Sequence, residues 1–251
     1  MRALLKFKFQ NHLILPIHYN NYLQALLYSN IENVNQRQQL HDTGYLVGAK
    51  KIKLFSFSKL FGKYEIKDKQ IIFSSPVSFI FSFYDDNIIS EIMYNFLKNT
   101  NYLNGTKIEI IDMIPLFFDE NKYRNINHFI IEMLSPMVSY ITKDNKKIFI
   151  DPWDPKFESA IKNNILTKLK AVGKESKEIE FSIFPNNRKN SRDEKVVYFK
   201  DTLIKGYNGI YTVKSTPEIM RLIYYAGIGS KNPEGFGCFK ILGDNIYDQF
   251  H

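Results

Sequence analysis

The order of hydrophobic periods along the chain constrains its fold more than any other feature. At the start of the chain, apolar residues alternate with charged ones, which is the period-two pattern of a half-buried strand. From residue 19 the period lengthens to that of an amphipathic helix, which we predict over residues 19–31. The apolar residues of the first strand are Ala3, Leu5, Phe7 and Phe9. Later in this half we predict strands at 53–59 and within 70–83, a helix at 88–97 and a strand at 106–114.

A second cycle of the same kind follows a polar break. Residues 119–127 are charged and lack periodicity, so we predict two domains, 1–122 and 123–251. The second cycle has predicted strands at 128–134, 137–142, 178–184, 195–213 and 238–242, and helices within 153–171 and at 218–226. The β-α-β-β-α-β order therefore occurs twice, and the expected fold is α+β with two tandem ferredoxin-like units packed side by side. A chain of 251 residues has room for two units of about 100–150 residues each.

Amino-acid composition limits the kinds of partner that the protein could bind and the cellular compartment in which we expect it. The net charge of +8 and a pI near 9.2 favour a polyanion, either nucleic acid or an acidic membrane surface. Lysine supplies most of the basic residues, and lysine suits contact with a phosphate backbone. Cys238 is the only cysteine, which excludes an intrachain disulfide and a cysteine-rich zinc site, so we expect a cytoplasmic protein. No apolar run approaches the roughly 20 residues that cross a bilayer.

The most specific motif is a glycine-rich segment at residues 227–237. Two Gly-apolar-Gly triplets, at 227–229 and 235–237, are separated by five residues, after a predicted helix and before a predicted strand. The segment lacks the third glycine of a dinucleotide-binding fingerprint and the Gly-Lys-Ser/Thr ending of a phosphate loop. Glycines permit positive φ and a close approach of the backbone, so we expect N–H groups here to face phosphates or bases, with Lys231 adding charge.

This segment resembles the C-terminal glycine-rich motif of the repeat-associated RNA-binding superfamily of CRISPR systems, in particular its Cas-six repeat-processing endoribonucleases. The resemblance covers nearly the whole chain. Leu15-Pro16 with the helix that follows resembles the first helix of that family, residues 53–58 resemble its second strand, and residues 134–138 resemble the strand that enters its second half. The resemblance implies cleavage of a CRISPR precursor RNA within the repeat to give guide RNAs.

Members of that family often combine a tyrosine on the first helix, a histidine just after it and a lysine leading the second strand. Tyr28, His41 and Lys53 match these places. The resemblance implies that His41 is the general acid or base, that Lys53 stabilises the phosphorane, and that Tyr28 orients the site or transfers a second proton. Such chemistry uses no metal and no cofactor. The five histidines show no paired ligand spacing that would favour a metal site.

Several assignments stay open at this stage. His18, and after it His12, are alternative catalytic histidines, and Lys50 or Lys51 could replace Lys53, because alternation along a strand would put Lys51 and Lys53 on one face. Tyr28 taken alone would be a core aromatic on a helix. The residues predicted to bind RNA are Gly227, Gly229, Ser230, Lys231, Gly235, Gly237 and Lys51.

The expected partner is CRISPR repeat RNA, with subunits of an interference complex or a second copy of the chain as further candidates. Two other functions compete with RNA cleavage. One is a non-cleaving repeat-binding subunit of the same superfamily, and the other is a ferredoxin-like metabolic or scaffold protein whose basic surface is incidental.

Overall fold

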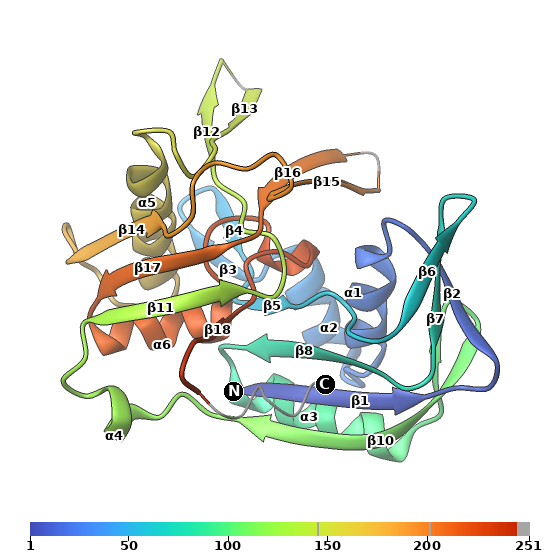
Figure 1. The fold of residues 1–251 in the computed structure, drawn as a ribbon. Coiled ribbons are helices and arrows are strands. Elements are labelled where there is room, and N and C mark those ends of the chain that lie inside the picture. Colours follow the sequence, from blue (N-terminus) through green and yellow to red (C-terminus); the bar gives the residue numbers. More distant parts are fainter. Residues whose placement is uncertain (145, 201, 245–251) are drawn as a thin grey trace.

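The structure is a computed structural model that describes residues 1–144, 146–200 and 202–244. Two sheets lie side by side, and helices pack against each of them (Figure 1). The strands of the first sheet come from residues 2–116 of the chain, and those of the second come from residues 128–241. We call these parts of the chain the first half and the second half.

The first sheet has the strand order β5-β8-β1-β10-β9, and every neighbouring pair is antiparallel. Its strands are β1 (Arg2–Lys8), β5 (Phe55–Phe57), β8 (Val77–Phe83), β9 (Asn101–Leu103) and β10 (Thr106–Leu116), and its helices are α1 (Asn20–Ser29) and α3 (Asp86–Lys98). Along the chain the order is β1, α1, β5, β8, α3, β10. The ferredoxin-like unit predicted for the first half is confirmed.

The second sheet has the order β14-β17-β11-β18, again with antiparallel neighbours. Its strands are β11 (His128–Met133), β14 (Phe181–Pro185), β17 (Ile210–Ser215) and β18 (Phe239–Ile241), and its helices are α5 (Phe157–Ala171) and α6 (Pro217–Ala226). The order β11, α5, β14, β17, α6, β18 repeats that of the first half, so the second predicted unit is also confirmed.

Both faces of β1 are buried. Leu5 and Phe7 point into the core between the first sheet and its helices, as the alternating pattern predicts. Leu4 points the other way and packs against Leu134 and Cys238 of the second half. Arg2 is fully buried on that same side, where its guanidinium donates to the carbonyl oxygens of Phe239 (2.7 Å) and Tyr224. The second half therefore covers the face of β1 that would otherwise meet solvent.

Short strands extend the two units. They form a sheet of β2 (His12–Pro16), β7 (Gln70–Ser74) and β6 (Tyr64–Lys67), and three hairpins: β3 (Tyr45–Val47) with β4 (Lys50–Ile52), β12 (Tyr140–Lys143) with β13 (Lys146–Phe149), and β15 (Glu194–Phe199) with β16 (Thr202–Tyr207). Residues 195–213, predicted as strand material, thus form three strands. Within 137–142, Met137 and Val138 make only isolated bridges, and regular pairing begins at Tyr140.

One helix of more than a single turn was not predicted. Helix α2 (Val34–Asp42) begins after Asn33, whose side chain accepts a hydrogen bond from the backbone N–H of Gln36 at 3.1 Å, and this capping favours a helix start. Only Val34 and Leu40 are apolar in α2, so it shows no amphipathic stripe. The remaining helical turns are α4 (Glu120–Tyr123) and η1 (Asn232–Glu234), a 3₁₀ turn inside the glycine-rich segment. Within the described ranges, no helix is long and apolar enough to cross a membrane.

Candidate functional site

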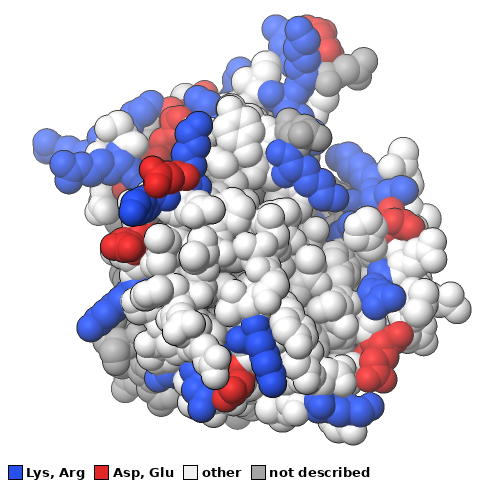
Figure 2. Space-filling model, turned by 90° about the vertical axis from the view of Figure 1, so that its right-hand side faces the viewer, with Lys and Arg blue, Asp and Glu red and all other residues white. Residues whose placement is uncertain are grey.

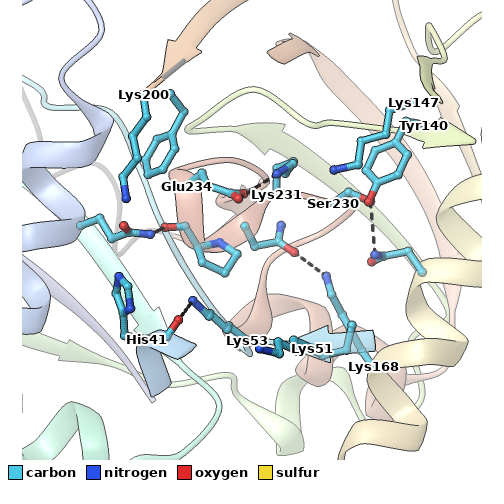
Figure 3. Close-up of a pocket in the computed structure, with 16 residues that line it drawn as sticks. His41, Lys51, Lys53, Tyr140, Lys147, Lys168, Lys200, Ser230, Lys231 and Glu234 are labelled. Atoms are coloured by element: carbon cyan, nitrogen blue, oxygen red, sulfur yellow. Dashed lines mark hydrogen bonds and ion pairs between the residues drawn. The ribbon is translucent and has the colours of Figure 1, made fainter. Parts of the chain in front are cut away.

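A cleft of about 460 Å³ lies between the two halves and collects residues from both (Figure 3). The first half contributes residues of α1, α2 and β4 and the link that follows β4. The second half contributes residues of α5, of the β12–β13 and β15–β16 hairpins, and of the glycine-rich segment. The predicted site residues that line this cleft are His41, Lys51, Lys53, Ser230 and Lys231.

The cleft is strongly basic. Among the described residues that line it, one carboxylate, that of Glu234, stands against six lysines, and it is ion-paired with Lys231 at 2.9 Å. More Lys and Arg side chains crowd the projecting hairpin at the top of the molecule (Figure 2). A concave surface with such an excess of one sign concentrates an anionic ligand such as a phosphodiester chain. The six lysines are Lys51, Lys53, Lys147, Lys168, Lys200 and Lys231.

His41 lies in the last turn of α2, and its ring lines the cleft. Its Nδ1 is 2.7 Å from a carboxylate oxygen of Asp42, and this hydrogen bond is the main cause that holds the pKa of Asp42 below its usual value. When Nδ1 donates to the carboxylate, Nε2 remains as the acceptor of the neutral ring. The Asp42 carboxylate thus orients the His41 ring.

Tyr28 lies behind His41 rather than in the cleft. The two rings meet edge to face, with centroids 5.5 Å apart, and the other side of Tyr28 packs against Phe55. The Tyr28 hydroxyl is buried and has no hydrogen-bond partner among the described residues. Burial, followed by the charges of Glu234 and Asp42, raises the pKa of Tyr28 well above its usual value. In this arrangement the Tyr28 ring packs against the His41 ring, and Tyr28 does not line the cleft.

The resemblance implied that Lys53 leads the second strand, but the structure places it outside any strand. It lies in the two-residue link between β4 and β5, since β4 ends at Ile52. Its Nζ donates to the backbone carbonyl oxygen of His41, and desolvation is the main cause that lowers the pKa of Lys53. Lys51 is exposed on β4. Both lysines line the cleft, although they do not share one strand, and Lys50 is not part of the cleft wall.

The glycine-rich segment is built differently from the expectation. Gly227, Gly229, Gly235 and Gly237 all have positive φ, between 70° and 86°, as predicted, but all four are buried. A Cβ on Gly237 would lie 2.0 Å from a carbonyl oxygen, and a Cβ on Gly235 would lie 2.5 Å from the ring of Phe57. These glycines permit tight packing within the protein. Of the predicted RNA-binding residues in this segment, only Ser230 and Lys231 line the cleft.

Several backbone N–H groups of the segment are used inside the protein. Those of Ile228, Ser230 and Gly237 donate to the carbonyl oxygens of Gly237, Val138 and Pro136 at 2.8–2.9 Å. The prediction that a row of N–H groups faces the ligand is therefore wrong for these three, because the segment folds back on itself and on the chain after β11.

Hydrogen bonds from the first half also hold the glycine-rich segment. Two residues one turn apart on α1 reach across to η1: the Asn20 amide donates to the carbonyl oxygen of Glu234 at 2.8 Å, and the Gln24 amide donates to that of Pro233 at 2.6 Å. Neither of these two contacts was predicted from the sequence. They connect the helix that carries Tyr28 to the segment that carries Lys231.

A buried lysine was also missed. Lys168 on α5 is 2% exposed, and its Nζ donates to the carbonyl oxygens of Gly227 (2.5 Å) and Gly229 (2.9 Å) and to the side-chain oxygen of Asn232 (2.8 Å). The signal was present in the sequence, because Lys168 follows Ile161 and Ile165 at helical spacing on the buried face of α5. A lysine on such a face is rarely fully buried unless its ammonium is satisfied.

The other candidate histidines lie elsewhere. The ring of His18 packs edge to face against Tyr198, with centroids 5.3 Å apart, and His12 is exposed on β2. Neither lines the cleft. In the part of the chain that the structure describes, no three His, Cys, Asp or Glu residues are grouped so that they could hold a metal ion.

Comparison with known proteins shows which proteins the chain resembles. The family described as CRISPR associated protein Cas6, C-terminal, matches residues 119–241. The CRISPR-associated endoribonuclease Cas6 of Pyrococcus furiosus is 23% identical over 234 residues, covering 91% of this chain and 84% of that protein.

Solved structures share the fold over almost their whole length. One, of the product of a Cas6-related gene from Pyrococcus furiosus, has a TM-score of 0.80 at 22% identity and covers 97% of this chain and 99% of its own. Another, described as a RAMP protein binding different RNA substrates, has a TM-score of 0.78 at 21% identity and covers 96% of this chain and 99% of its own.

Proposed function

We propose that this protein, which belongs to the Cas6 family, cleaves CRISPR precursor RNA within the repeat to release guide RNAs. The observation that carries the proposal is the basic cleft between the halves, in which His41, Lys51 and Lys53 of the first half face Ser230 and Lys231 of the second (Figure 3). A relative that aligns over most of the chain is named as an endoribonuclease, which supports the same reading.

The proposed reaction is attack of a ribose 2′-OH on the adjacent phosphorus. This reaction needs a base for the 2′-OH proton, an acid for the departing 5′-oxygen and a cation beside the negative charge of the phosphorane. We assign both proton transfers to His41: its neutral Nε2 takes the 2′-OH proton and then gives it to the departing 5′-oxygen, while Asp42 fixes its Nδ1. The products are a 5′-hydroxyl and a 2′,3′-cyclic phosphate or, after hydrolysis, a 3′-phosphate. No step draws on a metal ion, so cleavage should survive a chelator.

We assign stabilisation of the phosphorane to Lys53, with Lys51 as the second candidate. The bond from Lys53 Nζ to the carbonyl oxygen of His41 keeps this cation beside the proposed proton-transfer group, whereas the Lys51 side chain is exposed. Tyr28 acts as the support of the His41 ring. The division of the chain into domains 1–122 and 123–251 remains part of this proposal, with the catalytic residues in the first domain and the glycine-rich segment in the second.

The distinguishing experiment compares His41→Ala with His18→Ala on a repeat RNA from the same host. We expect His41→Ala to lower the single-turnover cleavage rate by about 10²–10⁴-fold, the usual contribution of a general acid or base, with unchanged RNA affinity. His18→Ala should leave both quantities nearly unchanged, because its ring packs against Tyr198.

The other outcomes identify the competing functions. Tight binding by the wild-type protein without any cut would indicate a non-cleaving repeat-binding subunit. Absence of both binding and cutting would indicate a scaffold or metabolic protein.

A further inference from the structure

Lys168 presents an unusual combination of burial and partners. Its side chain is almost completely inaccessible, yet the ammonium group has no ion-pair partner among the described residues. Its three N–H donors instead match three acceptors, all of which belong to residues 227–232. A buried charge is tolerated only when its hydrogen bonds are satisfied, and here the glycine-rich segment alone satisfies them.

The same helix makes a second contact with this segment. Asn164 lies one turn before Lys168 on α5, and its amide is 3.4 Å from the hydroxyl oxygen of Ser230. The backbone N–H of Ser230 donates to the carbonyl oxygen of Val138 at 2.8 Å. Helix α5 thus underlies the first glycine triplet, and the residue after that triplet is turned towards the cleft.

The two glycines of the first triplet have no side chains that could fix the orientation of their peptide units. Gly227 and Gly229 have positive φ, a region that glycine enters freely but leaves as freely. Their carbonyl oxygens both accept hydrogen bonds from the Lys168 ammonium, and the third bond of this ammonium, to Asn232, is a dashed line in the close-up (Figure 3). A single cation therefore fixes the orientation of two flexible peptide units and one side chain.

We propose that Lys168 is a positioning residue, which fixes the glycine-rich segment from beneath so that Ser230 and Lys231 face the phosphate backbone of the bound RNA. Lys168 itself does not touch the RNA, because its three donors are already occupied. This inference rests on the proposed function insofar as the ligand is repeat RNA.

Protonation of Lys168 offers a readout that simple packing would not give. Burial lowers the pKa of Lys168 to about 7. The protonated ammonium satisfies all three acceptors, whereas the neutral amine has only two N–H groups and leaves one acceptor unpaired. A bound polyanion also favours the protonated form. RNA binding therefore takes up a proton at Lys168, so the contribution of Lys168 to RNA affinity is fully present below about pH 7 and is lost as the pH rises above it.

The test uses Lys168→Met, which keeps the length of the side chain and removes the ammonium, beside Lys170→Met, an exposed lysine on the same helix. RNA affinity is measured with an uncleavable repeat RNA at about pH 6 and at about pH 8.5, on either side of the titration. We expect Lys168→Met to lose about tenfold or more in affinity at the lower pH, the scale of lost charge-assisted hydrogen bonds. The deficit should shrink at the higher pH, and Lys170→Met should show neither effect.

Other groups that titrate or carry charge around the cleft are the same in wild type and variant, so the difference between the two pH profiles belongs to Lys168. These groups are His41, Lys51, Lys53, Lys147, Lys200, Lys231 and Glu234. A folded Lys168→Met protein that binds as tightly as wild type at the lower pH would overturn the proposal. A deficit of equal size at both pH values would also overturn it, since that result would indicate packing alone.

A second measurement covers the case in which Lys168→Met does not fold. In Lys168→Gln, which retains two N–H donors on a shorter side chain, hydrogen–deuterium exchange should show that residues 227–237 lose protection relative to Lys170→Met while the sheets do not. Unchanged protection of this segment would refute the role of Lys168. Neither measurement requires cutting, and exchange requires no RNA, so failure of the proposed activity is distinguishable from failure of this proposal.

Discussion

Substitution of Gly237 tests whether the glycine-rich segment is a buried, tightly packed part of the protein or an open ligand-binding loop. Gly237 has a φ of +74°, and an added Cβ would lie 2.0 Å from the carbonyl oxygen of Ile228 and 2.4 Å from the amide of Asn232. Gly105, in the turn between β9 and β10, has a φ of +79°, but an added Cβ would meet nothing within 4 Å. The two glycines therefore share the backbone conformation and differ only in their surroundings.

The expected magnitudes follow from that difference. An alanine with positive φ costs roughly 1–2 kcal/mol of stability, which is the whole effect expected for Gly105→Ala. Forcing a methyl group into a packed interior adds about 1–3 kcal/mol, so Gly237→Ala should lose about 2–5 kcal/mol in total. The nearest clash is with a backbone oxygen rather than with the end of a flexible side chain, so relaxation is restricted.

Chemical denaturation in urea supplies the measurement, with the free energy of unfolding extrapolated to zero denaturant. Gly237→Ala is expected to be less stable than Gly105→Ala, or not to fold, even in the absence of RNA. Equal stability of the two variants, with a loss of RNA affinity confined to Gly237→Ala, would contradict the packed arrangement. It would restore the open loop expected from sequence.

Three further predictions follow from the cleft and the interface. Tyr28→Phe removes a buried hydroxyl that has no partner among the described residues, so the free energy of unfolding should stay the same or rise slightly. The single-turnover cleavage rate should stay within a few-fold of the wild-type rate. A loss of about 10²-fold or more would instead indicate that the hydroxyl donates a proton. Lys51→Met should reduce the salt dependence of RNA binding by about 0.7 in log–log slope, which corresponds to one phosphate contact; an unchanged slope would remove Lys51 from the interface. Arg2→Met should cost about 2–4 kcal/mol in urea denaturation, because the carbonyl oxygens of Phe239 and Tyr224 lose a buried donor, whereas exposed Arg192→Met should change stability little.

Much of the fold was predictable because the signal is local. The alternation of Ala3, Leu5, Phe7 and Phe9 and the helical spacing that follows it are set by which face of each element is buried. Both β-α-β-β-α-β cycles were identified on this basis. Helix α2 was not, because its cap at Asn33 stabilises a largely polar helix that leaves no apolar stripe to detect.

The site was predictable only in part. His41, Lys51, Lys53, Ser230 and Lys231 share one cleft, and a family resemblance could supply that set. The contributions of Asp42, Asn20, Gln24 and Lys168 depend on contacts between residues far apart in the chain, or on a side chain that turns towards its neighbour.

The glycines show a further limit of sequence reasoning. The spacing of their two triplets predicts positive φ, and the glycines have positive φ in the structure. The same φ occurs both in tightly packed buried segments and in exposed loops. The distinction depends on what packs around each Cα. Sequence alone does not contain that information for Gly235 beside Phe57 of the first half.

The central claim is that this cleft cuts RNA through 2′-OH chemistry without a metal ion. The most direct measurement incubates the purified protein, in excess chelator, with its host repeat RNA and with copies that carry a single 2′-deoxy substitution at successive positions. We predict one discrete cut that persists in chelator and disappears when one particular 2′-OH is removed. Loss of cutting in chelator, or a cut that no single 2′-deoxy substitution prevents, would contradict the account.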